Sequence, residues 1–109
     1  MRYVSQILHT ASAGTGDGEI LNVSRVEALN VHFVNTGSPV GTLTFKGCVD
    51  SSRVWFDVAM EKVDGTLATS TTTPGYFRLP LNHGLYEFKA EIGPYTSGSF
   101  AVRSGRRHG

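Results

Sequence analysis

Apolar and polar residues alternate with a period of two along most of this chain, and that rhythm limits the fold more than any other feature. It is clearest in residues 86–92, where the apolar positions are Tyr86, Phe88, Ala90 and Ile92. Successive side chains of a β-strand point to opposite faces, so this pattern predicts a strand with one buried face. No window of about a dozen residues keeps the helical spacing i, i+3, i+4 and i+7. We therefore expect strands and no helices.

Turn signals such as Asp17-Gly18, Asp64-Gly65 and Pro74-Gly75 separate the alternating runs at short intervals. We expect strands near residues 2–9, 18–24, 26–35, 40–49, 53–60, 66–71, 75–81, 84–92 and 98–104. Short strands with a turn about every 8–12 residues are typical of sandwiches and jelly rolls. The sequence therefore predicts an all-β chain, an antiparallel β-sandwich or jelly-roll-like fold of about eight short strands.

The chain has 109 residues, a length that suits one domain. We divide it into an N-terminal strand or arm with a glycine-rich connection (1–17), a β-sandwich domain (18–104) and a basic flexible tail (105–109). No apolar run reaches the roughly 18 residues that cross a membrane. The first residues also lack the apolar stretch and cleavage site of a signal peptide. We expect neither a membrane partner nor a signal peptide.

The sequence contains no arrangement of residues that predicts catalysis. Cys48 is the only cysteine, and we interpret it as a small, half-buried hydrophobic residue rather than a reactive thiol. The four histidines are scattered without metal-binding spacing. The glycine-rich residues 14–18 lack the spacing of a nucleotide-binding loop. We expect no catalytic residues, no cofactor and no metal, and the chain is predicted not to be an enzyme.

The charges of the chain nearly cancel. Ten lysines and arginines against nine acidic residues give a formal net charge of +1. That balance does not suit a protein held to nucleic acid by its overall field, so we expect no nucleic-acid partner. Near the C-terminus, Arg106 and Arg107 are candidate contacts to an acidic partner. The alternative is that they belong to a frayed, solubilising chain end.

Trp55 is the most informative single residue. The even positions of residues 53–60 are apolar, namely Val54, Phe56, Val58 and Met60. If these face the core, Trp55 points to the opposite face together with Arg53 and Asp57. An outward tryptophan flanked by charges is a natural anchor for a protein surface or a sugar ring. We therefore predict that Arg53, Trp55 and Asp57 bind a partner. The alternative is that Trp55 packs beneath a loop or under the edge of a second sheet.

Three segments of the chain resemble a known group of proteins. Residues 41–50 (GTLTFKGCVD) are followed within five positions by Trp55, and residues 74–79 and 95–102 share the likeness. Together they resemble small virion proteins of tailed bacteriophages and prophages. The likeness extends over residues 18–104.

This resemblance implies a β-sandwich that coats capsids or sits in tail structures, with no catalytic motif positions. In the family's pattern a small residue or serine precedes Val-Asp and a glycine often follows it. The chain departs from that pattern at Cys48 and Ser51. The departure affects the expected geometry of the turn.

The resemblance leads us to expect a phage virion structural protein, specifically a capsid decoration (cement) protein. Such a protein binds the head surface and stabilises neighbouring capsid subunits. Its expected partners are the major capsid protein or other virion proteins, and a homo-oligomer such as a trimer at local three-fold axes. It would be made in the host bacterial cytoplasm and reside in the virion, with residues 1–13 pairing with a second copy or with the shell. A tail or head–tail junction component is the alternative within this class.

A carbohydrate-binding module is the alternative from a different class. It would use Trp55 with Tyr76, Tyr86 or Tyr95 as a stacking platform for a glycan. Most aromatic residues fall at inward positions of the expected strands, which argues against this alternative.

Overall fold

The structure is a computed structural model, and it describes residues 2–12, 16, 18–24, 26–34, 40–79, 84–97 and 100–108. These residues form eleven strands and no helix. In chain order the strands are β1 (Arg2–Ser12), β2 (Leu21–Asn22), β3 (Val26–Val34), β4 (Val40–Cys48), β5 (Phe56–Asp57), β6 (Met60–Lys62), β7 (Leu67–Ala68), β8 (Ser70–Thr71), β9 (Gly75–Arg78), β10 (Glu87–Ser97) and β11 (Phe100–His108). The described residues contain no helix long and apolar enough to cross a membrane.

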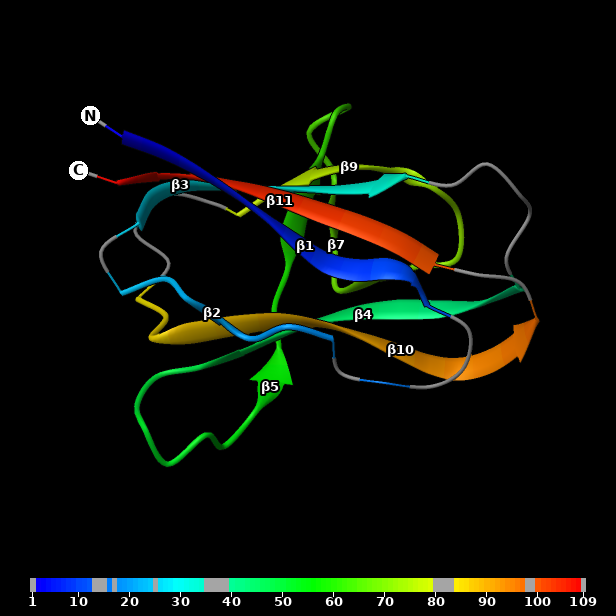
Figure 1. The fold of residues 1–109 in the computed structure, drawn as a ribbon, viewed down its shortest axis with the longest axis horizontal. Helices are drawn as coiled ribbons and strands as arrows, with labels where there is room; N and C mark the ends of the chain where they lie inside the picture. The colour runs from blue at the N-terminus through cyan, green and yellow to red at the C-terminus, as the bar shows by residue number, and fades with distance from the viewer. Residues whose placement is uncertain are drawn as a thin grey trace.

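The strands form two antiparallel sheets that pack face to face. One sheet has six strands in the order β1-β11-β3-β9-β6-β7. The other has five, in the order β2-β10-β4-β5 with β8 paired to β4. Figure 1 shows the two layers, with β1, β11, β3 and β9 above β2, β10 and β4. The predicted all-β antiparallel sandwich is confirmed, although several strands are shorter and more numerous than the sequence suggested.

The core lies between the two sheets and contains the inward positions of the alternating runs. On β10 these are Phe88, Ala90 and Ile92, all fully buried. Phe45 of β4 and Phe77 of β9 meet across the sandwich with ring centroids 4.9 Å apart. Burying a side chain of this size contributes about 1.5–3 kcal/mol. These contacts hold the two sheets together and fix the positions of the loops between them.

Gly47, near the end of β4, is a close contact point of the core. A Cβ atom added there would lie 2.8 Å from Val58 Cγ2 and 2.9 Å from Leu85 Cδ1. Both distances are shorter than those of real Cβ contacts, so a side chain at this position would force Val58 or Leu85 to move. The chain segments that carry Val58 and Leu85 therefore pack directly against the β4 backbone, next to the loop that follows β4.

The predicted strand at 53–60 is wrong. Only β5 and β6 form in this region, and they belong to different sheets, because β5 pairs with β4 and β6 pairs with β9. The chain crosses from one sheet to the other between β5 and β6. Residues 53–60 therefore cannot form one strand with a single inward face. Val58 and Met60 are buried as predicted, but Val54 and Phe56 are 74% and 42% exposed.

The two ends of the chain also differ from the sequence prediction. Residues 105–108, expected in a flexible tail, form the end of β11, which pairs with β1 on one side and β3 on the other. Backbone pairing on both sides holds this segment in the sheet despite its basic residues. The predicted arm is β1, which pairs with β11 of the same chain and is the outermost strand of its sheet. In the glycine-rich connection, Gly16 exchanges two backbone hydrogen bonds with Ile92, at 3.1 and 2.7 Å.

Candidate functional site

The loop between β4 and β5, residues 49–55, extends beyond the edge of the five-stranded sheet (Figure 1). It starts where the N–H of Tyr86 donates to the carbonyl of Cys48 at 2.7 Å. It then turns because Asp50 Oδ1 accepts hydrogen bonds from the backbone N–H and the hydroxyl of Ser52. This is a turn that an aspartate side chain makes with its own neighbours. The hydroxyl of Ser52 lowers the pKa of the Asp50 carboxyl, with its backbone N–H as the next cause.

Arg53 closes the turn in an unusual backbone conformation. Its φ is 55°, in the left-handed region that residues other than glycine seldom occupy. Its N–H donates to the carbonyl of Asp50 at 3.2 Å. Holding a residue there costs of order 1–3 kcal/mol unless its surroundings compensate. The side chain of Arg53 supplies such a compensation.

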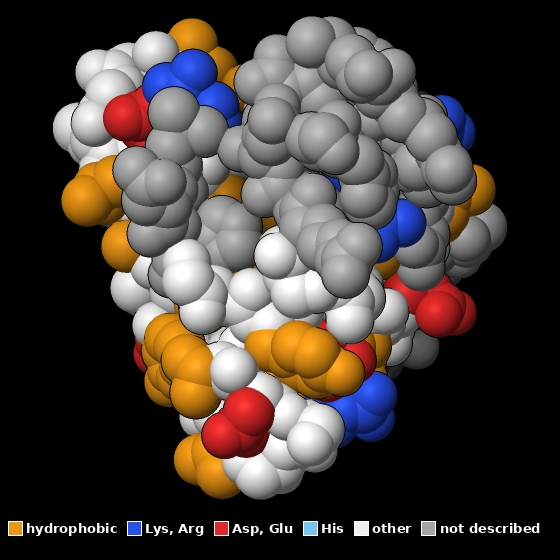
Figure 2. Space-filling model, turned by 90° about the vertical axis from the view of Figure 1, so that its left-hand side faces the viewer, with side chains coloured by type: hydrophobic (Ala, Val, Ile, Leu, Met, Phe, Trp, Pro, Cys, Tyr) orange, Lys and Arg blue, Asp and Glu red, His pale blue; other side chains and the backbone are white. Residues whose placement is uncertain are grey.

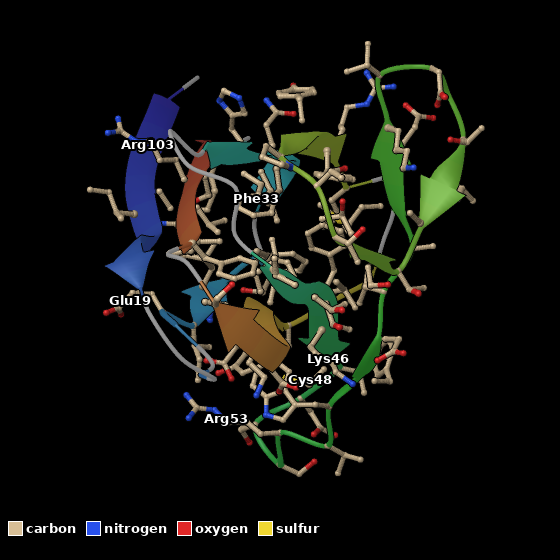
Figure 3. All side chains as sticks on the ribbon, turned by 90° about the vertical axis from the view of Figure 1, so that its right-hand side faces the viewer. Glu19, Phe33, Lys46, Cys48, Arg53 and Arg103 are labelled. Carbon is tan, nitrogen blue, oxygen red and sulfur yellow. The ribbon has the colours of Figure 1, made fainter. Side chains whose placement is uncertain are left out.

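The guanidinium of Arg53 forms a two-pronged ion pair with Glu87 of β10. Nε lies 2.8 Å from Oε1 and Nη2 lies 3.0 Å from Oε2. Glu87 is buried, and its Oε1 also lies 4.0 Å from the thiol of the buried Cys48. The hydrogen bonds that the guanidinium donates to Glu87 are the main reason that the pKa of Arg53 is raised. Paired hydrogen bonds between planar groups fix orientation as well as distance, so this contact anchors the loop to the sheet. Figure 3 shows Lys46, Cys48 and Arg53 together at this end of the molecule.

Trp55 packs onto the same sheet face. Lys89 of β10 places its Nζ 4.5 Å from the centre of the Trp55 ring, close enough for a cation–π interaction. Lys89 is buried, and its Nζ also lies 3.6 Å from Glu91 Oε2. Trp55 is half-buried, so it is neither a core residue nor a fully outward one. Its position corresponds to the alternative in which the tryptophan packs against other structure.

Asp57 completes the contacts to the sheet. Its carboxylate pairs with the ammonium of Lys46 on β4, and this hydrogen bond is the main cause of the raised pKa of Lys46. Arg53, Trp55 and Asp57 therefore each contact a charged residue of β4 or β10. The sequence did not indicate these three contacts, because each joins residues at least 11 positions apart.

Three apolar side chains lie on or beside the loop without being covered. Val49 is 63% exposed, and Val54 and Phe56 are exposed as well. Figure 2 shows the side of the molecule to which the loop extends, with hydrophobic side chains separated by polar and acidic ones in its lower part. Sequence reasoning assigned Val54 and Phe56 to the core and so missed them as surface residues. Asp50, Ser51 and Ser52 are residues that favour turns, and they are the sequence signal for an exposed loop here.

Arg106 lies elsewhere. It is part of β11, and its Nη1 donates to the carbonyl of Asn22 on β2 at 3.1 Å, which links the two sheets. The backbone of Arg107 pairs opposite Tyr3 and Ala28, while its side chain lies outside the described residues. The structure thus does not bring Arg106 to the loop. Within the described part of the chain, no three or more histidine, cysteine, aspartate and glutamate residues are grouped to hold a metal ion.

Comparison with known proteins identifies the fold. No protein family model matches the chain, and no curated protein matches its sequence. Two solved structures are similar. The SPBc2 prophage-derived protein YomS matches 96% of this chain and 92% of its own, with a TM-score of 0.84 and 19% identity. The PBSX exported protein XepA also matches 96% of this chain, but only 37% of its own, with a TM-score of 0.84 and 21% identity. At this level of identity the likeness establishes that the chain shares the fold of these two proteins.

Proposed function

We propose that this chain is a structural protein of a bacteriophage or prophage particle. The observation that carries the proposal is the fold, which matches two proteins named after prophages over 96% of the chain. The YomS match supports it further, because it also spans 92% of that protein, so the two chains correspond along nearly their whole lengths. The independent resemblance of residues 41–50, 74–79 and 95–102 to small phage virion proteins points to the same class.

The β4–β5 loop is the surface that we assign to binding another protein of the particle. Its exposed side chains, Val49, Val54 and Phe56, gain most from being covered by a partner. Its base is fixed by the Arg53–Glu87 pair, so little conformational freedom is lost on binding. A loop that is ordered before binding gives more affinity per contact than one that must become ordered.

Capsid decoration is the role within the particle that we propose. The molecule is small, with extents of 37 × 29 × 24 Å, and one loop with a few exposed apolar side chains offers a modest contact area. Repeating a modest contact by symmetry over a shell gives strong overall attachment. The outer edge of β1 offers a second contact, to a neighbouring copy, by strand pairing. A tail or head–tail junction position would use the same surfaces and differ in copy number.

A carbohydrate-binding role centred on Trp55 is less well supported. One face of the Trp55 ring lies against Lys89, so this ring is not an open platform. Tyr76 belongs to β9 in the six-stranded sheet, while Trp55 contacts the five-stranded sheet. The tyrosine and the tryptophan therefore do not form one stacking surface.

Co-sedimentation with phage particles tests the proposed docking surface. The particles would come from a deletion mutant that lacks this gene, made from a phage whose genome encodes the protein. We expect the wild-type protein to sediment with them, and the double variant Val54→Ser/Phe56→Ser to bind at least about tenfold more weakly, because its apolar contacts are lost. Leu67→Ser is the matched control, because Leu67 is also an exposed apolar residue, at 61% between Phe56 and Val54, but lies in β7. Equal binding of the double variant would contradict the role of the loop, and no binding of the wild type would contradict a particle role.

A further inference from the structure

A pocket of about 350 Å³ opens beside β9 of the six-stranded sheet. It forms because β6 ends at Lys62, opposite Phe77, so that Gly75 and Tyr76 have β3 on one side and no described strand on the other. The turn after β6 and the segment before β9 then stand apart as two walls. Small-molecule sites in proteins have volumes upward of roughly 300 Å³, so this pocket suits a compact ligand.

Tyr76 provides an aromatic surface at the pocket. Its side chain is 41% exposed. Its ring meets His32 of β3 edge-on, with ring centroids 6.4 Å apart and an interplanar angle of 65°, which supports the ring from the side. The buried Phe77 lines the pocket next to it. The exposed ring of Tyr76 offers a flat apolar contact for a ligand that has an apolar face of its own.

Polar residues also line the pocket. They come from both walls, and the residues are Lys62, Asp64, Thr71 and Thr73. The pKa of the Asp64 carboxyl is lowered mainly by a hydrogen bond from the hydroxyl of Thr66, so Asp64 is an anionic acceptor at neutral pH. One lysine and one aspartate leave the lining without net charge. A neutral polar ligand suits such a lining better than a phosphate or a carboxylate.

Both walls of the pocket are fixed before any ligand enters. On the β6–β7 side, Asp64 Oδ1 accepts from the backbone N–H and hydroxyl of Thr66 at 3.0 and 2.7 Å. On the β8–β9 side, the hydroxyl of Thr71 donates to the carbonyl of Thr73 at 2.8 Å and accepts from its N–H at 3.2 Å. Preformed walls reduce the cost of ordering on binding.

We propose that this pocket binds a neutral sugar unit of a glycan. A pyranose ring has one face of C–H groups and a rim of hydroxyls. The C–H face would stack on the Tyr76 ring. The hydroxyls would donate hydrogen bonds to the carboxylate of Asp64 and accept them from the ammonium of Lys62. The site is separate from the β4–β5 loop, and the inference goes beyond the structural role proposed above and does not depend on it.

Nuclear magnetic resonance titration of the full chain, labelled with nitrogen-15, tests the proposal. The probes are the methyl glycosides of glucose, galactose, mannose, rhamnose and N-acetylglucosamine, with glucose 6-phosphate as the charged comparison. We expect at least one neutral glycoside to bind with a dissociation constant on the order of millimolar, as suits a ligand of this size. The shifted amides should be those of residues 62–64, 71–73 and 75–77. Failure of all five glycosides to bind, or shifts elsewhere on the molecule, would overturn the assignment.

Variants of Tyr76 test the stacking surface. Tyr76→Ala should weaken binding of the same glycoside about 3- to 10-fold, while Tyr76→Phe keeps the ring and should stay near wild type. Phe56→Ser is the matched control, because Phe56 is also an exposed aromatic residue but lies in β5 and does not line the pocket. This substitution should leave glycoside binding unchanged. The amide spectrum of each variant reports whether it is folded. Unchanged binding by a folded Tyr76→Ala protein, or tighter binding of glucose 6-phosphate than of any neutral glycoside, would contradict the proposal.

Discussion

Lys46 of β4 and Lys89 of β10 lie directly opposite each other on the outer face of the five-stranded sheet. Two like charges in this position destabilise a sheet. Each lysine here has a carboxylate of its own: Asp57 pairs with Lys46, and Glu91 lies 3.6 Å from Lys89. Lys89 also lies against the Trp55 ring. Trp55, just before β5, and Asp57, within it, thus attach this part of the chain to the sheet. The same two residues stabilise the facing lysines.

Replacing Asp57 by asparagine should expose this repulsion. We expect Asp57→Asn to lower the free energy of unfolding by about 0.5–1 kcal/mol, the range for partly exposed ion pairs. The loss should shrink in high salt, which screens the two lysines from each other. Urea unfolding at low and high ionic strength measures both effects. Glu61→Gln is the control, because it removes the Arg78 pair on the other sheet, where Arg78 faces Asn30 rather than a second cation. A loss for Asp57→Asn that grows with salt would contradict this account.

Two substitutions of Arg53 separate its backbone strain from its ion pair. Both Arg53→Ala and Arg53→Gly remove the contact to Glu87, but only glycine accepts a φ of 55° without strain. We expect the alanine variant to be less stable than the glycine variant by about 1 kcal/mol. Thermal unfolding of the two proteins under identical conditions measures the difference. If alanine proved equal to or better than glycine, Arg53 would not occupy the left-handed conformation in solution.

Gly47→Ala should destabilise the protein more than Gly105→Ala does. Its new Cβ meets Val58 and Leu85 at under 3 Å, and overpacking of this kind costs about 1–3 kcal/mol. Gly105→Ala in β11 is the control, because nothing lies within 4 Å of a Cβ added there. Calorimetry should therefore show a lowered melting temperature for Gly47→Ala and little change for Gly105→Ala. Equal effects of the two would mean that Val58 and Leu85 do not pack against β4 as described.

The two turns built on Asp50 and Asp64 predict a dependence of stability on acid pH. Hydrogen bonds from the hydroxyls of Ser52 and Thr66 lower the pKa values of these carboxyls in the folded chain below the ordinary 3.8. Each carboxylate therefore contributes stability above pH 3.8, and the contribution is lost as the pH falls through the lowered pKa. The double variant Asp50→Asn/Asp64→Asn should lose less stability than wild type between pH 5 and pH 2. Denaturant unfolding across that interval measures this, and parallel curves for the two proteins would contradict it.

How far the sequence predicts this molecule can be seen on β10. Its alternation predicted the buried Phe88, Ala90 and Ile92, because period two is a local property of any strand with one face in a core. It could not predict that Glu87 and Lys89 on the other face are buried too. They are covered by the β4–β5 loop, about 35 residues away along the chain.

The difference between a local pattern and contacts made by distant parts of the chain also explains the error at residues 53–60. The alternation there continues without interruption although the chain leaves one sheet and joins the other. Nothing local marks that crossing, so Val54 and Phe56 were assigned to the core. Arg53, Trp55 and Asp57, predicted to bind a partner, each contact a charged residue of the five-stranded sheet. The pocket beside Tyr76, by contrast, depends on where β6 ends, and the sequence gives no sign of it.

The central claim is that this protein is part of a phage particle, and its copy number in purified particles tests that claim most directly. Particles of the phage that carries the gene would be banded in a density gradient, and quantitative mass spectrometry would compare the protein with the major capsid protein. The account predicts that the protein bands with the particles at a fixed ratio corresponding to many copies per particle. Recovery of the protein only in particle-free fractions would contradict it.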